Sequence, residues 1–272
     1  DATYKTLDEF PDRQLLGEDV IWIGNDDEGY FSSHRIFTRA THTNLGVYGE
    51  PSGKKLSYRV IADCACRNNQ VYDEWLVRDQ GAIVRQLGLD PKKYAHKLIH
   101  DEGGIEKCAV PFNLDTPNDV PADGIYIAPN ISKENTGVRY AEILKQIFNN
   151  EKNAIEKNYD RAIQQEQPGG FTGHGREEVA TFWNTFMSAF PDYKFTIEHI
   201  SYTEEKNQAK KAAIRWSLVG SHSGKGNFGN PSNTPIYVMG ISHAEFGPRG
   251  IKNEWVLFDE TIIWKQILMK TG

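Results

Sequence analysis

The residues best suited to chemistry lie in a short passage that the chain contains twice, "DEWLVRDQGAIVRQLG" at 73–88 and "NEWVLFDETIIWKQIL" at 253–268. Each passage carries a glutamate before a tryptophan, Glu74 in the first and Glu254 in the second. A carboxylic acid among apolar side chains such as Trp183 has its pKa raised by desolvation. Such a group can act as a general acid or base, which typically contributes about 10²–10⁴ in rate. Glu254 is therefore the candidate catalytic residue.

His222 is the candidate partner of Glu254, because it closes a neighbouring predicted strand and its ring can carry a proton near neutral pH or donate a hydrogen bond to a substrate. The sequence also allows a structural role for both residues, in which Glu254 bonds a buried backbone group or Arg215 and His222 caps a turn. Asp79 and Asp259 precede predicted helices. We expect them to cap these helices by accepting hydrogen bonds from free backbone N–H groups.

An internal repeat explains why the passage occurs twice. Shifting the sequence by 180 positions aligns residues 10–86 with 190–266 without a gap. The loop "THTNLGVYGEPSG" of the first copy matches "SHSGKGNFGNPSN" of the second, and His42 aligns with His222. A match that keeps one register across Gly, Pro, Trp and His positions indicates two copies of one domain.

Hydrophobic spacing in the second copy predicts helices followed by strands. Residues 138–148 and 177–190 have apolar side chains at helical spacing, and Pro191 ends the second helix. The period then changes to two, which predicts strands divided by Gly, Pro and Asn turns. This order is typical of an α+β domain whose helices pack on one face of the sheet. We expect two tandem cone-shaped domains, each a curved mixed or antiparallel sheet with helices on its concave face, which encloses a pocket.

The repeat divides the chain into domain one (1–90), a linker (91–136) and domain two (137–272). The linker is rich in Pro, Asn and Asp and is expected to begin with a short helix. The counterpart of residues 137–180 would lie before Asp1. Either the N-terminal helices of domain one are missing from this chain, or its cone is truncated and its pocket open.

Composition excludes several classes of partner. A net charge of -6 argues against a general nucleic-acid surface, which needs clustered Lys and Arg, and no apolar run approaches the length of a membrane span. The chain has three cysteines, and Cys64 and Cys66 would share one strand face in poor disulfide geometry. We expect free thiols, a cytoplasmic setting, and neither metal nor cofactor. The loop "GSHSGKGNFG" lacks the spacing of a phosphate-binding loop.

Several short motifs resemble SnoaL-like polyketide cyclases, which belong to the nuclear transport factor 2-like superfamily. They are "FPD", "GSH", "PSG" or "PSN", and the final strand that runs into "RQLG" or "KQIL", with "DQGAIVRQLG" an especially close match to the closing helix of the family. The resemblance covers about residues 1–90 and 137–270. It implies the cone fold and the tandem layout of members that are labelled ester cyclases.

The catalytic pattern of the family is not kept residue for residue. The last strand of SnoaL-type cyclases carries His-x-Asp, and its Asp is the acid/base of an aldol ring closure. Glu254 and Val256 occupy these positions in the second copy, and Glu74 and Leu76 occupy them in the first. Both copies therefore have a carboxylate in place of the His and an aliphatic residue in place of the Asp.

The expected cone places further residues. The predicted ligand-binding set of domain two is Tyr159 (expected on a helix), His174, Trp183, Phe186, Ser242 and Val256. Glu74 and His42 mark a secondary pocket in domain one. Because the outer sheet faces of this superfamily commonly pack together, we expect Asp63 and His243 in the contact between the domains; the alternative is that both are exposed and make no contact. The two domains would form an intramolecular pseudo-dimer, and further homo-oligomers are left open.

The favoured function is a cofactor-independent enzyme that moves a proton on a small, largely apolar molecule in the cavity of domain two. Cyclisation, isomerisation, dehydration and hydrolysis are all compatible with this chemistry. The alternative is a protein that binds such a ligand without reaction, since the family Asp is absent from both copies. A carboxylate at the inward position favours catalysis, and the missing Asp favours binding.

Overall fold

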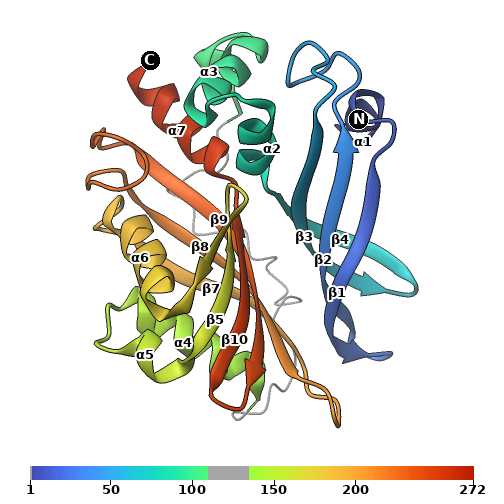
Figure 1. Cartoon of the computed structure of the whole chain (residues 1–272), viewed down its shortest axis with the longest axis vertical. Helices are drawn as coiled ribbons and strands as arrows, with labels where there is room; N and C mark the ends of the chain where they lie inside the picture. The colour runs from blue at the N-terminus through green and yellow to red at the C-terminus, as the bar shows by residue number, and fades with distance from the viewer. Residues whose placement is uncertain (1, 110–134) are drawn as a thin grey trace.

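The computed structural model describes residues 2–109 and 135–272, with side chains from Thr6 onward. The part of the predicted linker at 110–134 lies outside the described residues. The framework is two β-sheets of four and six strands, each with associated helices (Figure 1). The chain is thus an α+β protein, as the sequence predicts.

Sheet one is an antiparallel meander in the order β1-β2-β3-β4. Its strands are β1 (Gln14–Asn25), β2 (Gly29–Thr41), β3 (Lys55–Arg67) and β4 (Gln70–Arg78). Asn68 and Asn69 form the turn between β3 and β4 with φ of 53° and 59°. Two adjacent residues with positive φ fit the hairpin turn that matches the twist of the strands, and Asn tolerates this conformation well.

Sheet two has the order β6-β5-β10-β9-β8-β7 and is mixed, because β5 runs parallel to β10. Its strands are β5 (Tyr159–Gln167), β6 (Phe171–His174), β7 (Lys194–Thr203), β8 (Lys210–Ser221), β9 (Pro235–Gly247) and β10 (Gly250–Phe258).

The helices fall into two groups in Figure 1. The first group comprises α1 (Ala2–Glu9) at the start of the chain and the helices near the contact of the two halves. These are α2 (Gln80–Leu87), α3 (Pro91–Asp101), the 3₁₀ turn η1 (Ile105–Lys107) and α7 (Glu260–Thr271). The helices that cover sheet two on the side away from sheet one are α4 (Thr136–Phe148), α5 (Ala154–Asn158) and α6 (Gly175–Ser188). The short helix expected at the start of the linker is confirmed as α3.

The internal repeat is present in the structure. Strands β3 and β9 have bounds that differ by 180 positions at both ends, as do β4 and β10. Strand pairing repeats as well, since Arg35 faces Ile61 and Arg215 faces Ile241. Even the irregularity between residues 17 and 19 of β1 recurs between 197 and 199 of β7. One backbone plan therefore serves both halves.

The hairpin of β5 and β6 was not expected from the sequence. Tyr159, which was expected on a helix, is the first residue of β5. The segment "DRAIQQEQ" shows little alternation of apolar and polar residues, so periodicity gives no strand signal. Pairing with β10 on one side and β6 on the other makes it a strand.

The two sheets differ in what covers them. Sheet two and its helices enclose an aromatic core in which Trp183, Trp216 and Phe186 are each at most 1% exposed. The corresponding face of sheet one has exposed side chains at Leu15 and Leu76, whose equivalents Phe195 and Val256 pack in the core of sheet two. Sheet one has no described counterpart of α4, β5 or β6.

Candidate functional site

Glu254 lies in the middle of β10, with its side chain fully buried between sheet two and the helices. The hydroxyl groups of Tyr140 and Tyr159 both donate hydrogen bonds to its Oε1, at 2.7 and 2.8 Å. The side-chain amide of Gln165 donates to its Oε2 at 2.6 Å. We call these four residues the Glu254 cluster.

Burial raises the pKa of Glu254, because the ionised carboxylate loses its hydration. The three hydrogen bonds act in the opposite sense, since they stabilise the ionised form, but burial outweighs them. Burial also raises the pKa of Tyr140 and Tyr159 well above the usual value, and the neighbouring carboxylate adds to this effect. Both phenols are therefore neutral donors, and the titratable member of the cluster is Glu254.

Helix α4 and strands β5 and β10 position the side chains of the Glu254 cluster. Tyr140 lies on α4, which Asn135 caps by accepting a hydrogen bond from the N–H of Val138. Gln165 faces Glu254 directly in the parallel register of β5 and β10. The cluster thus joins one helix and two adjacent strands.

The predicted lining residues of domain two are all in this half, but they have different surroundings. Trp183, Phe186 and Val256 belong to the buried aromatic core. Ser242 is also fully buried, and its Oγ accepts a hydrogen bond from the indole of Trp216 at 2.9 Å. His174 is exposed at the start of α6, where its backbone N–H donates to Glu178 Oε2.

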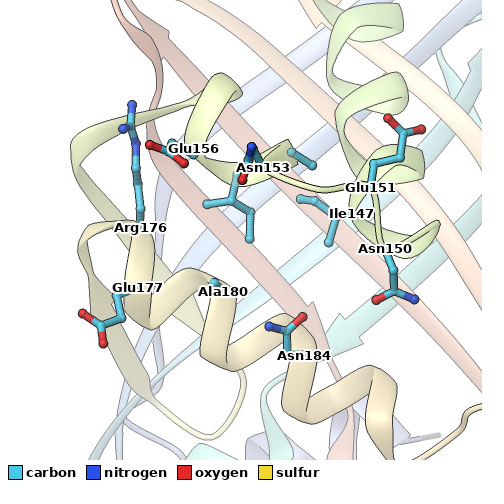
Figure 2. Close-up of a pocket in the computed structure, with 11 residues that line it drawn as sticks. Ile147, Asn150, Glu151, Asn153, Glu156, Arg176, Glu177, Ala180 and Asn184 are labelled. Atoms are coloured by element: carbon cyan, nitrogen blue, oxygen red, sulfur yellow. The ribbon is translucent and has the colours of Figure 1, made fainter.

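A cavity of about 470 Å³ opens between α4, α5 and α6 (Figure 2). Ile147 and Ala154 contribute its apolar wall, and Glu156, Arg176 and Asn184 are polar lining residues. Glu254 does not line it. The two sites are linked through one residue, because the Arg176 Nε in the cavity wall donates to the backbone oxygen of Tyr159 at 2.7 Å.

His222 is not in contact with the Glu254 cluster. It follows β8, its Nδ1 lies 3.0 Å from Ser232 Oγ, and its ring packs near Phe190. Burial lowers the pKa of His222. Arg215 is also remote from Glu254, since its Nε lies 3.4 Å from Asp63. The structure therefore gives His222 the surroundings of a loop anchor and gives Glu254 partners other than Arg215.

The two residues predicted for a pocket in domain one are separated. Glu74 is exposed on β4, in the position that corresponds to Glu254. His42 is buried beside the loop after β2, with its Nδ1 3.0 Å from Ser52 Oγ and its Nε2 3.2 Å from Glu9. The equivalents of one buried site in domain two thus have no common pocket in domain one.

Asp63 and His243 both lie where the two sheets meet. His243 Nε2 is 2.7 Å from Ser33 Oγ and its Nδ1 is 3.1 Å from the guanidinium of Arg35, so residues of sheet one provide both partners. Asp63 approaches Arg215 and His199 of sheet two, at 3.4 and 3.7 Å.

Two cation–π stacks flank these contacts. The guanidinium of Arg35 lies 3.5 Å from the ring centre of Trp255, and that of Arg215 lies 3.8 Å from the ring centre of Trp75. The two pairs are equivalent under the 180-residue shift. Each half therefore extends an arginine over the tryptophan of the other.

Sequence reasoning missed three residues of the site, namely Tyr140, Gln165 and Arg176. The sequence placed Tyr140 only on the apolar face of a helix. Its hydroxyl group was a signal, because a buried tyrosine hydroxyl usually has a hydrogen-bond partner. Gln165 had no signal, because the strand that carries it was not predicted.

Within residues 2–109 and 135–272, no group of three His, Cys, Asp or Glu side chains is arranged to hold a metal ion. Across the same ranges, none of the helices combines the length and apolarity that crossing a bilayer requires. The cysteines Cys64, Cys66 and Cys108 are free thiols.

Comparison with known families gives one match, to the SnoaL-like polyketide cyclase family over residues 139–267. This range includes the whole Glu254 cluster. No curated protein matches the chain.

Several solved structures are similar to about half of the chain. A protein described as a SnoaL-like polyketide cyclase from Jannaschia sp. CCS1 is 12% identical, with 51% of this chain and 97% of that chain covered and a TM-score of 0.42. One described as a polyketide cyclase from Bacillus cereus is 17% identical, with 48% and 80% covered and a TM-score of 0.39. IdmH of Streptomyces antibioticus, also described as a polyketide cyclase, is 16% identical, with 47% and 94% covered and a TM-score of 0.39.

Proposed function

We propose that the chain is a cofactor-independent acid/base enzyme, and the premise is that residues 139–267 match the family of SnoaL-like polyketide cyclases. Its substrate is a small, largely apolar molecule, and the reaction is a cyclisation, isomerisation, dehydration or hydrolysis that needs a proton moved. Domain two is the active half, and domain one, residues 1–90, is its structural mate.

The observation that carries the proposal is the Glu254 cluster. The raised pKa makes the Glu254 carboxylate a better proton acceptor than an ordinary carboxylate, which suits general acid/base catalysis. Tyr140 and Tyr159 hold Oε1 in place and stabilise the ionised form, while Gln165 fixes Oε2. In this proposal Glu254 accepts or donates the proton, and the other three are positioning residues.

In this proposal the substrate enters through the cavity between α4, α5 and α6, whose lining residues are drawn in Figure 2. The apolar wall of the cavity can contact the apolar part of the substrate, and Arg176 can orient a polar group of the substrate. Tyr159 connects the two sites, because its backbone oxygen accepts a hydrogen bond from Arg176 of the cavity wall and its hydroxyl donates to Glu254. A substrate that displaces the Tyr159 side chain from Oε1 reaches the carboxyl group.

The second candidate function is binding without reaction. It is favoured by the complete burial of Glu254, whose oxygens already receive three hydrogen bonds. A carboxylate satisfied in this way stabilises a polar centre inside an apolar core. The cavity would then hold a ligand whose protons are not exchanged.

Deuterium exchange separates the two candidates without knowledge of the natural reaction. Apolar β-keto esters have acidic C–H groups, and their exchange in D₂O can be followed by NMR. We expect the chain to accelerate exchange, and we expect Glu254→Gln to reduce the acceleration by about 10²–10⁴-fold. Glu142→Gln, on the exposed face of α4, is the matched control and should leave the rate unchanged.

Saturable binding of the esters without accelerated exchange supports the second candidate. Neither exchange nor binding overturns both. Circular dichroism of Glu254→Gln separates a loss of chemistry from a loss of fold.

A further inference from the structure

The inner face of sheet one, which corresponds to the core face of sheet two, carries a group of polar side chains at one end. Thr38 of β2 and Tyr58 of β3 face each other there. Arg13 directly precedes β1, and Arg78 is the last residue of β4. The equivalent positions of the second half hold side chains of its aromatic core, namely Tyr193, Leu218, Val238 and Phe258. Two arginines thus stand where the other half has apolar side chains.

These polar groups are buried without the partners that such groups normally have. Thr38 is fully buried and Tyr58 is only 3% exposed, whereas Arg13 and Arg78 are partly buried. The Nε atoms of both arginines and the Oγ1 of Thr38 are inaccessible to solvent and have no hydrogen-bond partner among the described residues. Buried polar atoms are usually satisfied, so an unsatisfied group of this kind calls for an occupant.

Other partly or fully buried arginines of sheet one have acidic partners. Arg35 and Arg59 both pair with Glu18, at 3.1 and 2.9 Å. In residues 2–109 and 135–272, by contrast, neither Arg13 nor Arg78 forms an ion pair with a carboxylate. Removing a charge from water without a counter-ion is costly. The missing element is therefore an anion.

The charges of the two arginines act on one point of the face. Burial raises the pKa of Tyr58, and the positive charges of Arg78 and Arg13 oppose this rise because they stabilise the phenolate. The two guanidinium groups therefore extend from opposite sides of the sheet toward the Tyr58 hydroxyl. An anion at this point receives charge-assisted hydrogen bonds from both arginines and neutral ones from the hydroxyl groups.

Beside the polar group, the same face is apolar and open. Leu15 and Leu76 are 56% and 44% exposed, and Ile36 between their strands is partly buried. A Cβ built on Gly17 would meet no described atom within 4 Å, whereas the equivalent Ile197 packs against the core of sheet two. The inner face of sheet one thus combines a cationic end with an accessible apolar surface.

We propose that the inner face of sheet one binds a monocarboxylic acid with an apolar body, with the carboxylate held between Arg13 and Arg78. The hydroxyl groups of the cross-strand pair complete its hydrogen bonds, and the apolar body covers the face between Leu15 and Leu76. The site is separate from the Glu254 cluster and does not rest on the function proposed for it. It gives domain one a ligand of its own.

A carboxylate fits this site better than a phosphate or a neutral ligand. Its plane matches the fork of a guanidinium group, which binds it through two parallel hydrogen bonds. A phosphate dianion would bring more charge to a face that is otherwise apolar, and its dehydration is more costly. A neutral ligand would leave both arginines without a counter-ion.

Octanoate is the probe for this site, titrated into the full chain at about pH 7, where a carboxyl group is ionised. Calorimetry should show saturable binding with a Kd below about 1 mM. Octan-1-ol has the same apolar body without the charge, and we expect it to bind at least roughly tenfold more weakly. Intermolecular NOEs from octanoate to the methyl groups of Leu15 and Leu76 locate the ligand.

Matched variants test the polar end of the site. Arg13→Gln and Arg78→Gln should each weaken octanoate binding by roughly tenfold, because each removes a charge-assisted hydrogen bond. Arg39→Gln is the control, since it removes the same charge at an exposed position of β2 and should leave the affinity unchanged. Thr38→Val keeps the shape of the buried side chain without its hydroxyl and should weaken binding by roughly two- to tenfold. Circular dichroism of each variant checks the fold.

Four results overturn the proposal. One is the absence of saturable octanoate binding up to about 10 mM. Another is equal weakening by Arg39→Gln, which would make the attraction an effect of net charge. A third is NOEs to Ile147 and Ile155 in place of Leu15 and Leu76, which would put octanoate in the cavity between α4, α5 and α6. The last is tighter binding of octyl phosphate, which would make the head group a phosphate.

Discussion

Glu74 and Glu254 are the same residue type at the same place in one backbone plan, yet their environments are opposite. Glu74 is exposed to solvent, whereas Glu254 is buried and its pKa is raised. The difference comes from Tyr140, Tyr159 and Gln165, which belong to elements without a counterpart among the described residues of the first half. The chemistry of a carboxylate is thus set by what covers it.

Tyr159→Phe tests this at the level of one hydrogen bond. The variant removes a donor that stabilises the ionised form, so we expect the pKa of Glu254 to rise further. The measurement is the ¹³C chemical shift of the Glu254 carboxyl group across pH. Tyr30→Phe, whose hydroxyl bonds Asp26 at the surface of sheet one, is the control and should leave the titration unchanged. An unshifted titration in Tyr159→Phe would remove Tyr159 from the cluster.

The loops after β2 and β8 are equivalent in the repeat, but different residues hold them in place. Each is closed by a bridge between two glycines, Gly46 with Gly49 in the first. There, Glu9 of α1 accepts hydrogen bonds from the backbone N–H groups of Val47 and Tyr48. The second loop has Ala189 in place of Glu9, and the Nε2 of His222 is buried without a hydrogen-bond partner among the described residues.

Glu9→Ala should therefore destabilise the first half. It leaves two backbone donors near a buried tyrosine without their acceptor, and the cost of such groups is about 1–3 kcal/mol. Urea unfolding followed by fluorescence measures the loss. Glu50→Ala, an exposed change in the same loop, should cost less than about 0.5 kcal/mol. Equal effects of the two changes would show that Glu9 does not anchor the loop.

At the same scale, the repeat and the strands after each "FPD" were predictable, because Gly, Pro and Trp positions kept one register. The hairpin of β5 and β6 was not. Its residues are mostly polar, and its strand conformation comes from pairing with β10, in which Glu254 lies 89 residues after its partner Gln165. The three partners of Glu254 could not be predicted either. The alternation of residues along a strand indicates that the carboxylate faces inward, but its neighbours depend on tertiary contacts.

The two halves of the molecule meet through a polar centre with apolar flanks, where Ile61 and Ile241 are both buried. Burial lowers the pKa of His243 to about 3, and the charge of Arg35 adds to this. An arginine can only donate, so the His243 Nδ1 that faces it accepts, and Nε2–H donates to Ser33. His243 is therefore neutral, and protonating it would place a second cation beside Arg35.

This arrangement makes stability depend on pH. A histidine with a lowered pKa binds fewer protons in the folded state, so its stability is present above pH 6.5 and is lost as pH falls toward 3. Between pH 6.5 and 5 the loss is roughly 2 kcal/mol, at 1.36 kcal/mol for each pH step. His243→Gln keeps one acceptor and one donor without a titrating group, so its stability should change less over this range.

Chemical denaturation of both proteins at the two pH values measures the difference, with exposed His96→Gln as the control. Protonation of Asp63 adds a further loss of stability at lower pH. Burial alone would raise its pKa, but His199, Ser33 and Arg215 together lower it, so its contribution is lost as pH falls through the lowered value. A pH dependence in His243→Gln equal to that of the unaltered chain would place the effect elsewhere.

Asp63 and His243 occupy the same site in the two copies of the repeat, but one is an acid and the other a base. A homodimer built from either half would have the same residue at this site in both subunits, two aspartates or two histidines. Joining the halves in one polypeptide removes that constraint, because a substitution on one side is no longer forced on the other. The sequence of each half can therefore change independently, and one half can no longer replace the other in the contact.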